Sequence, residues 1–368
     1  MRPFAISPDS PIRVFLVDDS PLALVMLKRM LATSPAIEVV GTARGGREAL
    51  EQFEHLRPEV ICTDYLMPDM DGLALIEAAM ERFPRPILVI SSTVDSAQRQ
   101  KAFPLLAAGA VDVVAKPSGN DSFEESAAEL VQKIKLVCGV RVIKRRAPVP
   151  LVTNPAVANA ISGGAVVSRP TLPASSATAN SNSNFKMPSS GSLFLPARGS
   201  KLIRMVAVGA STGGPQVLQT LFSSLPANFS CPIVCVQHIS TGFLDGLVEW
   251  LNAACRVRVK IAENGEQALP GTVYLPQENT HLEVDRQGHL MISQGPTVDG
   301  HKPSVTVAFD AVARAYGHSA VGVLLTGMGS DGAAGLESIA RAGGTTLAQD
   351  EASCVVFGMP KQAISRMW

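Results

Sequence analysis

The stretch Met205-Val-Ala-Val-Gly-Ala-Ser-Thr-Gly-Gly-Pro215 predicts a buried strand, a tight turn and the start of a helix. Its first residues are apolar, and Gly209 and Gly213 allow a turn that larger residues would obstruct. Pro215 suits the first turn of a helix, where its missing N–H costs little, and apolar residues recur downstream at helical spacing. The segment also fits the pattern G-x-S-x-G, in which the turn lifts a serine hydroxyl clear of the strand, close to backbone N–H groups.

Ser211 stands at the centre of this turn, and three interpretations of it remain open. Serine is a preferred helix N-cap, which would make its role structural. A phosphate-binding turn is disfavoured, because the glycines lack dinucleotide-fold or P-loop spacing and no Lys-Ser/Thr pair follows. A nucleophilic serine requires a base and an orienting acid from elsewhere in the chain.

Two other apolar segments supply such groups. Residues 232–237 read as a strand ending at His238, and residues 320–326 read as a strand followed by a glycine-rich loop that contains Asp331. If these strands neighbour that of Ser211 in one parallel sheet, a nucleophile, a base and an orienting acid meet at its carboxyl edge. His238 also suits an ordinary strand-end histidine, and Asp331 also suits a helix cap.

Other residues compete for the same roles. The order serine, histidine, aspartate differs from that of α/β-hydrolases and common serine proteases, which disfavours those folds. The rival bases are His55, His281, His289, His301 and His318, and the rival acid is Asp350.

The N-terminal part repeats the alternation of strand and helix. Apolar segments at residues 12–17, 60–63, 87–90 and 111–115 are separated by helical patterns, which predicts a parallel sheet. The polar residues that follow these segments are Asp18, Asp19, Asp64, Ser91 and Lys116. Converging carboxylates repel one another unless a cation neutralises them, and oxygen ligands suit Mg²⁺.

Length and composition bound the remaining possibilities. The 368 residues suffice for two domains, and a net charge of zero gives no general attraction for nucleic acid or anionic membranes. There is no signal peptide pattern and no apolar run long enough for a membrane span, and six scattered cysteines favour reduced thiols in the cytoplasm. We expect domains at 11–135 and 201–368, joined by a disordered linker at 147–200 rich in Pro, Ala, Ser, Asn and Thr.

The motifs of the first domain resemble those of the response-regulator receiver family over about residues 12–135. They are Asp-Asp-Ser after the first strand, Asp64-Tyr-Leu-Met-Pro-Asp-Met-Asp-Gly72, a serine after the fourth strand and Lys-Pro after the fifth. The resemblance implies a flavodoxin-like fold in which Asp64 accepts a phosphoryl group from a histidine kinase. It also implies contacts to the phosphoryl group from Ser91 and Lys116. The implied Mg²⁺ ligands are Asp19, Asp64 and the Leu66 carbonyl, with Asp18 acting through water.

The second domain resembles the catalytic domain of chemotaxis protein-glutamate methylesterases over nearly all of residues 203–365. The matching motifs are Gly-Ala-Ser-Thr-Gly-Gly, Gln-His, His301-x-Pro-Ser-Val305, Leu325-Thr-Gly-Met-Gly-x-Asp-Gly332 and Val356-Phe-Gly-Met-Pro360. The resemblance implies a Rossmann-like α/β domain without a cofactor. It implies that Ser211 is the nucleophile, His238 the general base and Asp331 its orienting acid, with the backbone N–H groups of His238 and Met328 as oxyanion donors.

The implied function is phosphorylation-activated hydrolysis of glutamate 5-methyl esters on methyl-accepting chemoreceptors, together with deamidation of receptor glutamines. Two departures from the family pattern are Thr306, where members usually carry an acid, and the long linker. The alternative is a phospho-regulated scaffold that binds receptors without turnover. A DNA-binding regulator is disfavoured, because the second domain lacks a basic helix-turn-helix.

Overall fold

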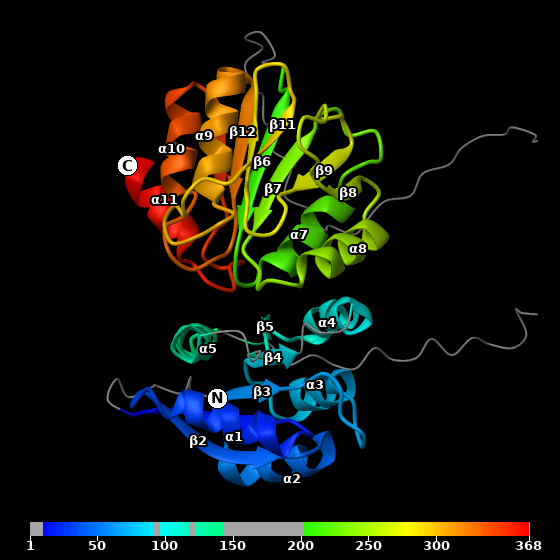
Figure 1. The fold of residues 1–368 in the computed structure, drawn as a ribbon, viewed down its shortest axis with the longest axis vertical. Coiled ribbons are helices and arrows are strands. Elements are labelled where there is room, and N and C mark those ends of the chain that lie inside the picture. Colours follow the sequence, from blue (N-terminus) through cyan, green and yellow to red (C-terminus); the bar gives the residue numbers. More distant parts are fainter. Residues whose placement is uncertain (1–9, 92–95, 118–121, 141, 143–201, 368) are drawn as a thin grey trace, which may run out of the picture. The chain divides into compact units, whose positions relative to one another are not determined.

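The computed structural model describes residues 10–91, 96–117, 122–140, 142 and 202–367, and the predicted linker at 147–200 lies outside them. The first sheet has five parallel strands in the order β2-β1-β3-β4-β5 (Figure 1). Its strands are β1 (Ile12–Val17), β2 (Ile37–Ala43), β3 (Val60–Thr63), β4 (Ile87–Ser91) and β5 (Asp112–Ala115). The helices between them are α1 (Pro21–Leu31), α2 (Gly46–Leu56), α3 (Gly72–Arg82), α4 (Ser96–Ala108) and α5 (Phe123–Cys138). This strand order is that of the flavodoxin-like fold, as predicted.

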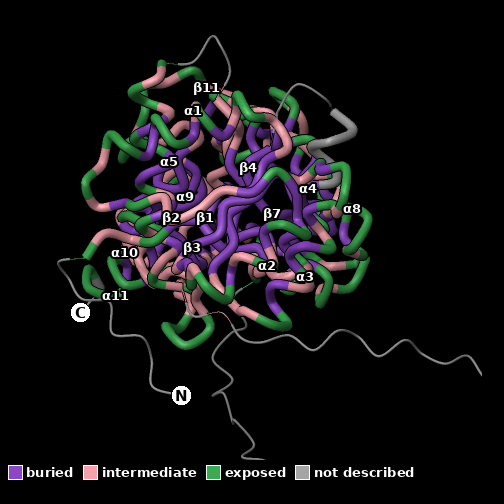
Figure 2. Tube along the Cα trace, turned by 90° about the horizontal axis from the view of Figure 1, so that it is seen from below, coloured by how far each residue is buried: buried purple, intermediate pink, exposed green. Residues whose placement is uncertain are grey.

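The strands of the first sheet have apolar side chains on both faces. Phe15 of β1 packs edge-on against Phe53 of α2, with ring centroids 5.1 Å apart. Its neighbours Val14 and Leu16 point the other way, into the cluster formed with α1 and α5. Such burial on both faces explains why these strands are continuous apolar runs. Figure 2 shows β3, β4 and β7 as buried, in agreement with the exposure of their residues.

The second sheet has six parallel strands in the order β13-β12-β6-β7-β9-β8. Its strands are β6 (Met205–Ala210), β7 (Ile233–Gln237), β8 (Arg258–Ile261), β9 (Thr272–Leu275), β12 (Ala320–Leu324) and β13 (Thr345–Ala348). The helices are α7 (Gly214–Ser223), α8 (Leu244–Ala254), α9 (Val305–Tyr316), α10 (Ala333–Arg341) and α11 (Met359–Met367), with a 3₁₀ turn at Gly317–Ser319. Helices α7 and α8 cover one face, and α9, α10 and α11 cover the other (Figure 1).

The predicted fold class is confirmed, with differences in detail. The second sheet differs from the Rossmann order because β9 lies between β7 and β8. The sequence patterns did not predict β2, β8, β9 or β13, nor the antiparallel hairpin of β10 (His281–Val284) and β11 (Leu290–Ser293). Strand β2 lies at the edge of its sheet and is largely half-buried or exposed, and β10 and β11 have only four residues each, so none of them is a long, continuously buried apolar run. Among the described residues, none of the helices combines the length and the apolar character that crossing a membrane requires.

Candidate active site

The three residues predicted to act together follow three adjacent strands. Ser211 follows β6, His238 follows β7, and Asp331 lies in the loop after β12. Strand β6 pairs with β7 on one side and with β12 on the other. From β6 the chain first adds β7, β8 and β9 on one side of this strand and then adds β12 and β13 on the other side. Open α/β sheets form their binding crevices at such a switch point.

The turn that carries Ser211 is held by backbone hydrogen bonds. The Ser211 N–H donates to the Thr326 carbonyl (3.0 Å), and the Ser211 carbonyl accepts from the Gly214 N–H (2.8 Å). Gly213 has φ of 77°, a left-handed conformation that favours glycine. A Cβ atom at Gly327 would lie 2.8 Å from Ser211 Cβ, so the loop after β12 approaches this turn closely only because residue 327 is glycine.

Asp331 is fully buried, and its carboxylate accepts four hydrogen bonds. Oδ1 accepts from Ser304 Oγ (2.8 Å) and the Thr306 N–H (2.9 Å). Oδ2 accepts from the Val305 N–H (2.7 Å) and His238 Nε2 (2.8 Å). Ser304 is the N-cap of α9, so the carboxylate lies against the positive end of that helix. Burial acts to raise the Asp331 pKa, but these hydrogen bonds outweigh it and the pKa is strongly lowered, which keeps the group ionised.

Thr306, the departure from the family pattern, belongs to this arrangement. Its hydroxyl oxygen accepts a hydrogen bond from the Gly332 N–H (2.7 Å) and its hydroxyl donates to Asp299 Oδ2 (3.4 Å). The side chain therefore fixes the residue after Asp331 without placing a second negative charge beside the carboxylate.

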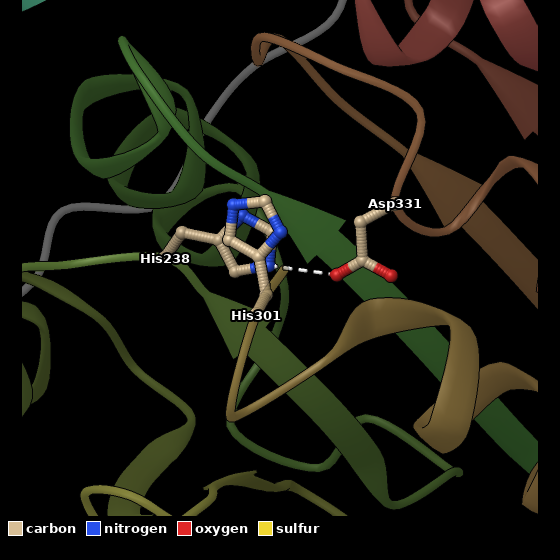
Figure 3. Close-up of side chains that lie close together, drawn as sticks. All are labelled: His238, His301 and Asp331. Carbon is tan, nitrogen blue, oxygen red and sulfur yellow. Dashed lines mark hydrogen bonds and ion pairs between the residues drawn. The ribbon is translucent and has the colours of Figure 1, made fainter. Parts of the chain in front are cut away.

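The hydrogen bonds of His238 define its tautomer. A carboxylate only accepts, so Nε2 carries the proton that it donates to Asp331, as drawn in Figure 3. Nδ1 then holds the lone pair of the neutral ring, and it is buried without a partner among the described residues. Burial lowers the His238 pKa more than the bond to Asp331 raises it, and the nearby positive charge of Lys133 lowers it further. The ring is therefore a neutral base at neutral pH.

His301 stacks on His238, with ring centroids 3.9 Å apart and ring planes 7° apart (Figure 3). The two histidines and Asp331 bring potential metal ligands within 4.8 Å of one another. Their arrangement does not suit an ion, because all four acceptor positions of Asp331 are used. The lone pairs of two parallel stacked rings also lie in parallel planes and do not converge on one point.

A cavity of about 500 Å³ opens at this edge and is lined by Ser211, Thr212, His238, His301 and Met328 among others. Within the described residues Ser211 Oγ makes no hydrogen bond, so the structure brings Ser211 and His238 to one cavity without joining them. A serine and its base often reach full alignment only when substrate is bound.

The two predicted oxyanion donors differ in availability. The His238 N–H already donates to the Ala210 carbonyl (3.0 Å), because the pairing of β6 with β7 continues one residue beyond β7. An incoming oxygen would therefore have to compete with a sheet hydrogen bond for the His238 N–H, so this donor stays a prediction. The N–H groups of Met328 and Thr212 have no hydrogen-bond acceptor in the part of the chain that the structure describes. Thr212 was not predicted from the sequence, although the residue after a G-x-S-x-G serine is a known type of oxyanion donor.

The rival bases and the rival acid lie elsewhere. His281 is buried with both ring nitrogens occupied, Nδ1 accepting from the Ser304 N–H (3.2 Å) and Nε2 donating to the Pro296 carbonyl (2.9 Å). Asp350 is exposed and accepts from Ser353. The remaining rivals outside the cavity are His55, His289 and His318. His301 is the one rival that the structure places beside His238.

The predicted residues of the first sheet also lie at the carboxyl ends of its strands. Carboxylate oxygens of Asp18, Asp19 and Asp64 lie within 4.8 Å of one another. Lys116 Nζ contacts Asp18 (2.6 Å) and Asp64 (2.7 Å). Burial raises the Asp64 pKa, and the ion pair with Lys116 opposes this.

The other predicted contacts of this site are Ser91 and Leu66, which lie at or just after the ends of β4 and β3. Ser91 is buried at the end of β4, and its carbonyl accepts from the Lys116 N–H (2.8 Å). Leu66 follows Asp64 by two residues and is 41% exposed. The oxygen-rich set formed with the three aspartates fits the preferences of Mg²⁺.

Residues of the first domain also contact the turn that holds Ser211. Asp112 Oδ2 accepts from Thr212 Oγ1 (3.1 Å) and forms an ion pair with Lys133 (2.6 Å). Lys133 and Glu129 of α5 line the cavity described above. The first domain and the serine turn are therefore linked by charged and polar groups.

The folds and sites described above define a class of protein, in which a receiver-type domain is combined with an α/β enzyme domain. The family model for the response regulator receiver domain matches residues 14–128, and that for CheB methylesterase matches residues 206–367. The expected domain ranges 11–135 and 201–368 enclose these two matches.

Curated relatives match along nearly the whole chain. The protein-glutamate methylesterase/protein-glutamine glutaminase 4 of Geobacter metallireducens is 39% identical over 96% of this chain and 92% of its own length. Protein 1 of the same name from Syntrophus aciditrophicus is 38% identical over the same shares. The crystal structure of the Thermotoga maritima CheB methylesterase catalytic domain is 38% identical, covers 45% of this chain and 89% of that one, and has a TM-score of 0.44. The chain belongs to the protein-glutamate methylesterase/protein-glutamine glutaminase family.

Proposed function

We propose that this protein hydrolyses glutamate 5-methyl esters on methyl-accepting chemoreceptors, deamidates receptor glutamines, and is activated by phosphorylation from a histidine kinase. The observation that carries the proposal is the buried pair of His238 and Asp331 beside Ser211 at the switch point of the second sheet. Activity at cytoplasmic receptors would place the protein in the cytoplasm.

The proposed reaction is acyl transfer through Ser211. After rotation of the serine side chain, His238 Nδ1 removes the hydroxyl proton while Oγ attacks the ester carbonyl. The proton then passes to the leaving methoxide, and methanol departs from the acyl-enzyme. Water, deprotonated by the same nitrogen, releases the glutamate carboxylate and free Ser211. Ammonia takes the place of methanol when the substrate is glutamine.

Stabilisation of the oxyanion is assigned to backbone donors. The N–H groups of Thr212 and Met328 belong to two loops that line the cavity, and a donor of this kind contributes about 10²- to 10³-fold to kcat in other acyl-transfer enzymes. Asp331 holds the His238 proton on Nε2 and stabilises the imidazolium that forms.

The dependence on pH should reflect the lowered pKa of His238. A protonated ring cannot accept the Ser211 proton, so activity is lost as pH falls through the folded-state pKa. Because burial lowers that pKa, we expect the acid limb of kcat/KM to have its midpoint below 6.5, the ordinary value for histidine. Hydrolysis of a glutamate 5-methyl ester peptide between pH 4.5 and 8 measures this, and a midpoint above 6.5 would contradict the assignment.

The receiver site would hold Mg²⁺ through Asp19, Asp64 and the Leu66 carbonyl, with Asp18 acting through water. When bound, the ion supplies positive charge that compensates the carboxylates and an incoming phosphoryl group. Asp64 accepts that group, Lys116 exchanges its ion pair with Asp64 for one with the phosphoryl oxygens, and Ser91 donates a hydrogen bond to them.

Regulation is expected because α5 lines the cavity beside Ser211. A small acyl phosphate with Mg²⁺ should raise methanol release from a methyl-labelled chemoreceptor fragment about 5- to 150-fold, the usual range of coupling between two sites. Asp64→Asn should remove the response, and a chelator should remove it from the whole chain. Residues 201–368 alone should release methanol faster than the unphosphorylated whole chain. Neither the acyl phosphate nor the chelator should change the rate of this fragment.

Two results would contradict this account. Absence of methanol release under all of these conditions would reject the esterase and favour the alternative, a phospho-regulated scaffold that binds receptors without turnover. Equal rates for residues 201–368 and the unphosphorylated whole chain would reject the regulatory part alone.

A further inference from the structure

Gln237, the last residue of β7, makes two hydrogen bonds that join the loops of the serine and the histidine. Its Nε2 atom donates to the Ser211 carbonyl (2.8 Å) and to the His238 carbonyl (2.7 Å). Both acceptors are carbonyl oxygens, so the amide nitrogen and not the amide oxygen must face them. The side chain is only 4% exposed, which protects both bonds from competition by water.

The surrounding chain makes room for this amide. A Cβ atom at Gly214 would overlap with Gln237 Oε1. Gly214 is the first residue of α7, where alanine is the better helix former, so the close approach of Gln237 gives a reason for glycine. Oε1 itself is buried and has no partner among the described residues. A buried amide with an unused acceptor costs stability, which indicates that its two donated bonds serve another purpose.

We propose that Gln237 is a positioning residue that fixes the separation and orientation of Ser211 and His238. Neither residue hydrogen-bonds to the other in this structure, so their alignment depends on the backbone of two loops. One planar amide connects those loops through a single nitrogen atom. Gln237 does not touch the reacting atoms and acts through the carbonyl groups of the two catalytic residues. This inference rests on the proposed acyl-transfer function.

The direct test is Gln237→Met, which keeps the length and approximate volume of the side chain but has no N–H donors. With a glutamate 5-methyl ester peptide and the whole chain, we expect kcat to fall on the order of 10- to 100-fold, the effect of misplacing a reacting group by up to about 1 Å. KM and the midpoint of the acid limb should stay close to wild type, because the cavity lining and the charges around His238 are unchanged. A purely structural role would instead lower the melting temperature and leave kcat per folded molecule unchanged.

Two further variants make the test decisive. Gln277→Met is the matched control, since Gln277 Nε2 donates to the Ala262 carbonyl (3.1 Å) and not to a carbonyl of Ser211 or His238, and it should retain wild-type kcat. Gly214→Ala leaves Gln237 chemically intact, but its Cβ would overlap with the Gln237 amide and lie 2.8 Å from Ala210 Cβ, and it should lower kcat in the same way. If Gln237→Met does not fold, the kcat of Gly214→Ala tests the proposal in its place.

The outcomes separate this inference from the proposed function. If Ser211→Ala is inactive while Gln237→Met, or in its place Gly214→Ala, has kcat within about twofold of wild type, positioning by Gln237 is rejected and the acyl-transfer function stands. If Ser211→Ala retains full activity, the acyl-transfer function fails and the inference fails with it.

Discussion

Replacing Ser211 with alanine is expected to lower kcat for glutamate 5-methyl ester hydrolysis about 10⁴- to 10⁶-fold, the range seen when one member of a serine triad is removed. The proposed reaction requires a covalent bond to Ser211 Oγ, and the oxyanion donors and the cavity alone cannot replace that bond. The smaller side chain fits the turn without altering its backbone hydrogen bonds, so the melting temperature should change little.

The measurement is methanol release from the peptide ester by the whole chain with phosphodonor present. A serine-reactive phosphonate should label the wild type and not the variant. Ser338→Ala is the matched control, because its hydroxyl donates only to the Ala334 carbonyl within α10 (3.2 Å). Activity of Ser211→Ala near that of the control would overturn the nucleophile assignment.

Replacing Asp331 with asparagine should reduce activity about 10⁴-fold, by analogy with the same change in other triads. Oδ1 receives the Thr306 N–H and Oδ2 receives the Val305 N–H. Whichever way the asparagine amide turns, its NH₂ group faces one of these backbone donors. If the NH₂ replaces Oδ2, it also faces His238 Nε2, which then must give up its proton and become the acceptor. The ring would hold its proton on Nδ1, where the base is required.

The same change should also destabilise the fold. Leaving one buried backbone donor without an acceptor costs about 1–3 kcal/mol, and loss of the charge at the N-terminus of α9 adds to this. Urea unfolding of Asp331→Asn measures the cost. Asp285→Asn is the control, because Asp285 is partly exposed and accepts from the N–H groups of Gln287 and His289 at the turn between β10 and β11. Wild-type activity and stability for Asp331→Asn would contradict the role given to the carboxylate.

Much of the fold could be predicted from the sequence, because strands buried on both faces are continuous apolar runs and helices between them keep a period of 3.6. Polar residues directly after such strands, as at Asp64 and Ser211, mark the carboxyl edge of a parallel sheet. The edge strands β2, β8 and β13 and the hairpin of β10 and β11 lacked these signals and were missed.

The partners of individual side chains could not be predicted in this way. Several histidines in the sequence were candidate bases, and their hydrogen bonds and positions in the structure distinguish them. His281 is occupied by two backbone groups, whereas His301 stacks on His238. Asp331 was weighed as a cap for the helix that follows it, yet its carboxylate caps α9, which precedes it in the chain.

The sequence by itself determined two parallel α/β sheets and the residues that stand at their carboxyl edges, because both depend on local hydrophobic patterning and on turn chemistry. Only the tertiary structure decided that β6 lies between β7 and β12, which nitrogen of His238 carries the proton, and that Gln237 joins the two catalytic loops. These features depend on the order of strands in the sheet and on hydrogen bonds between residues far apart in the chain. Neither leaves a periodic signal in the sequence.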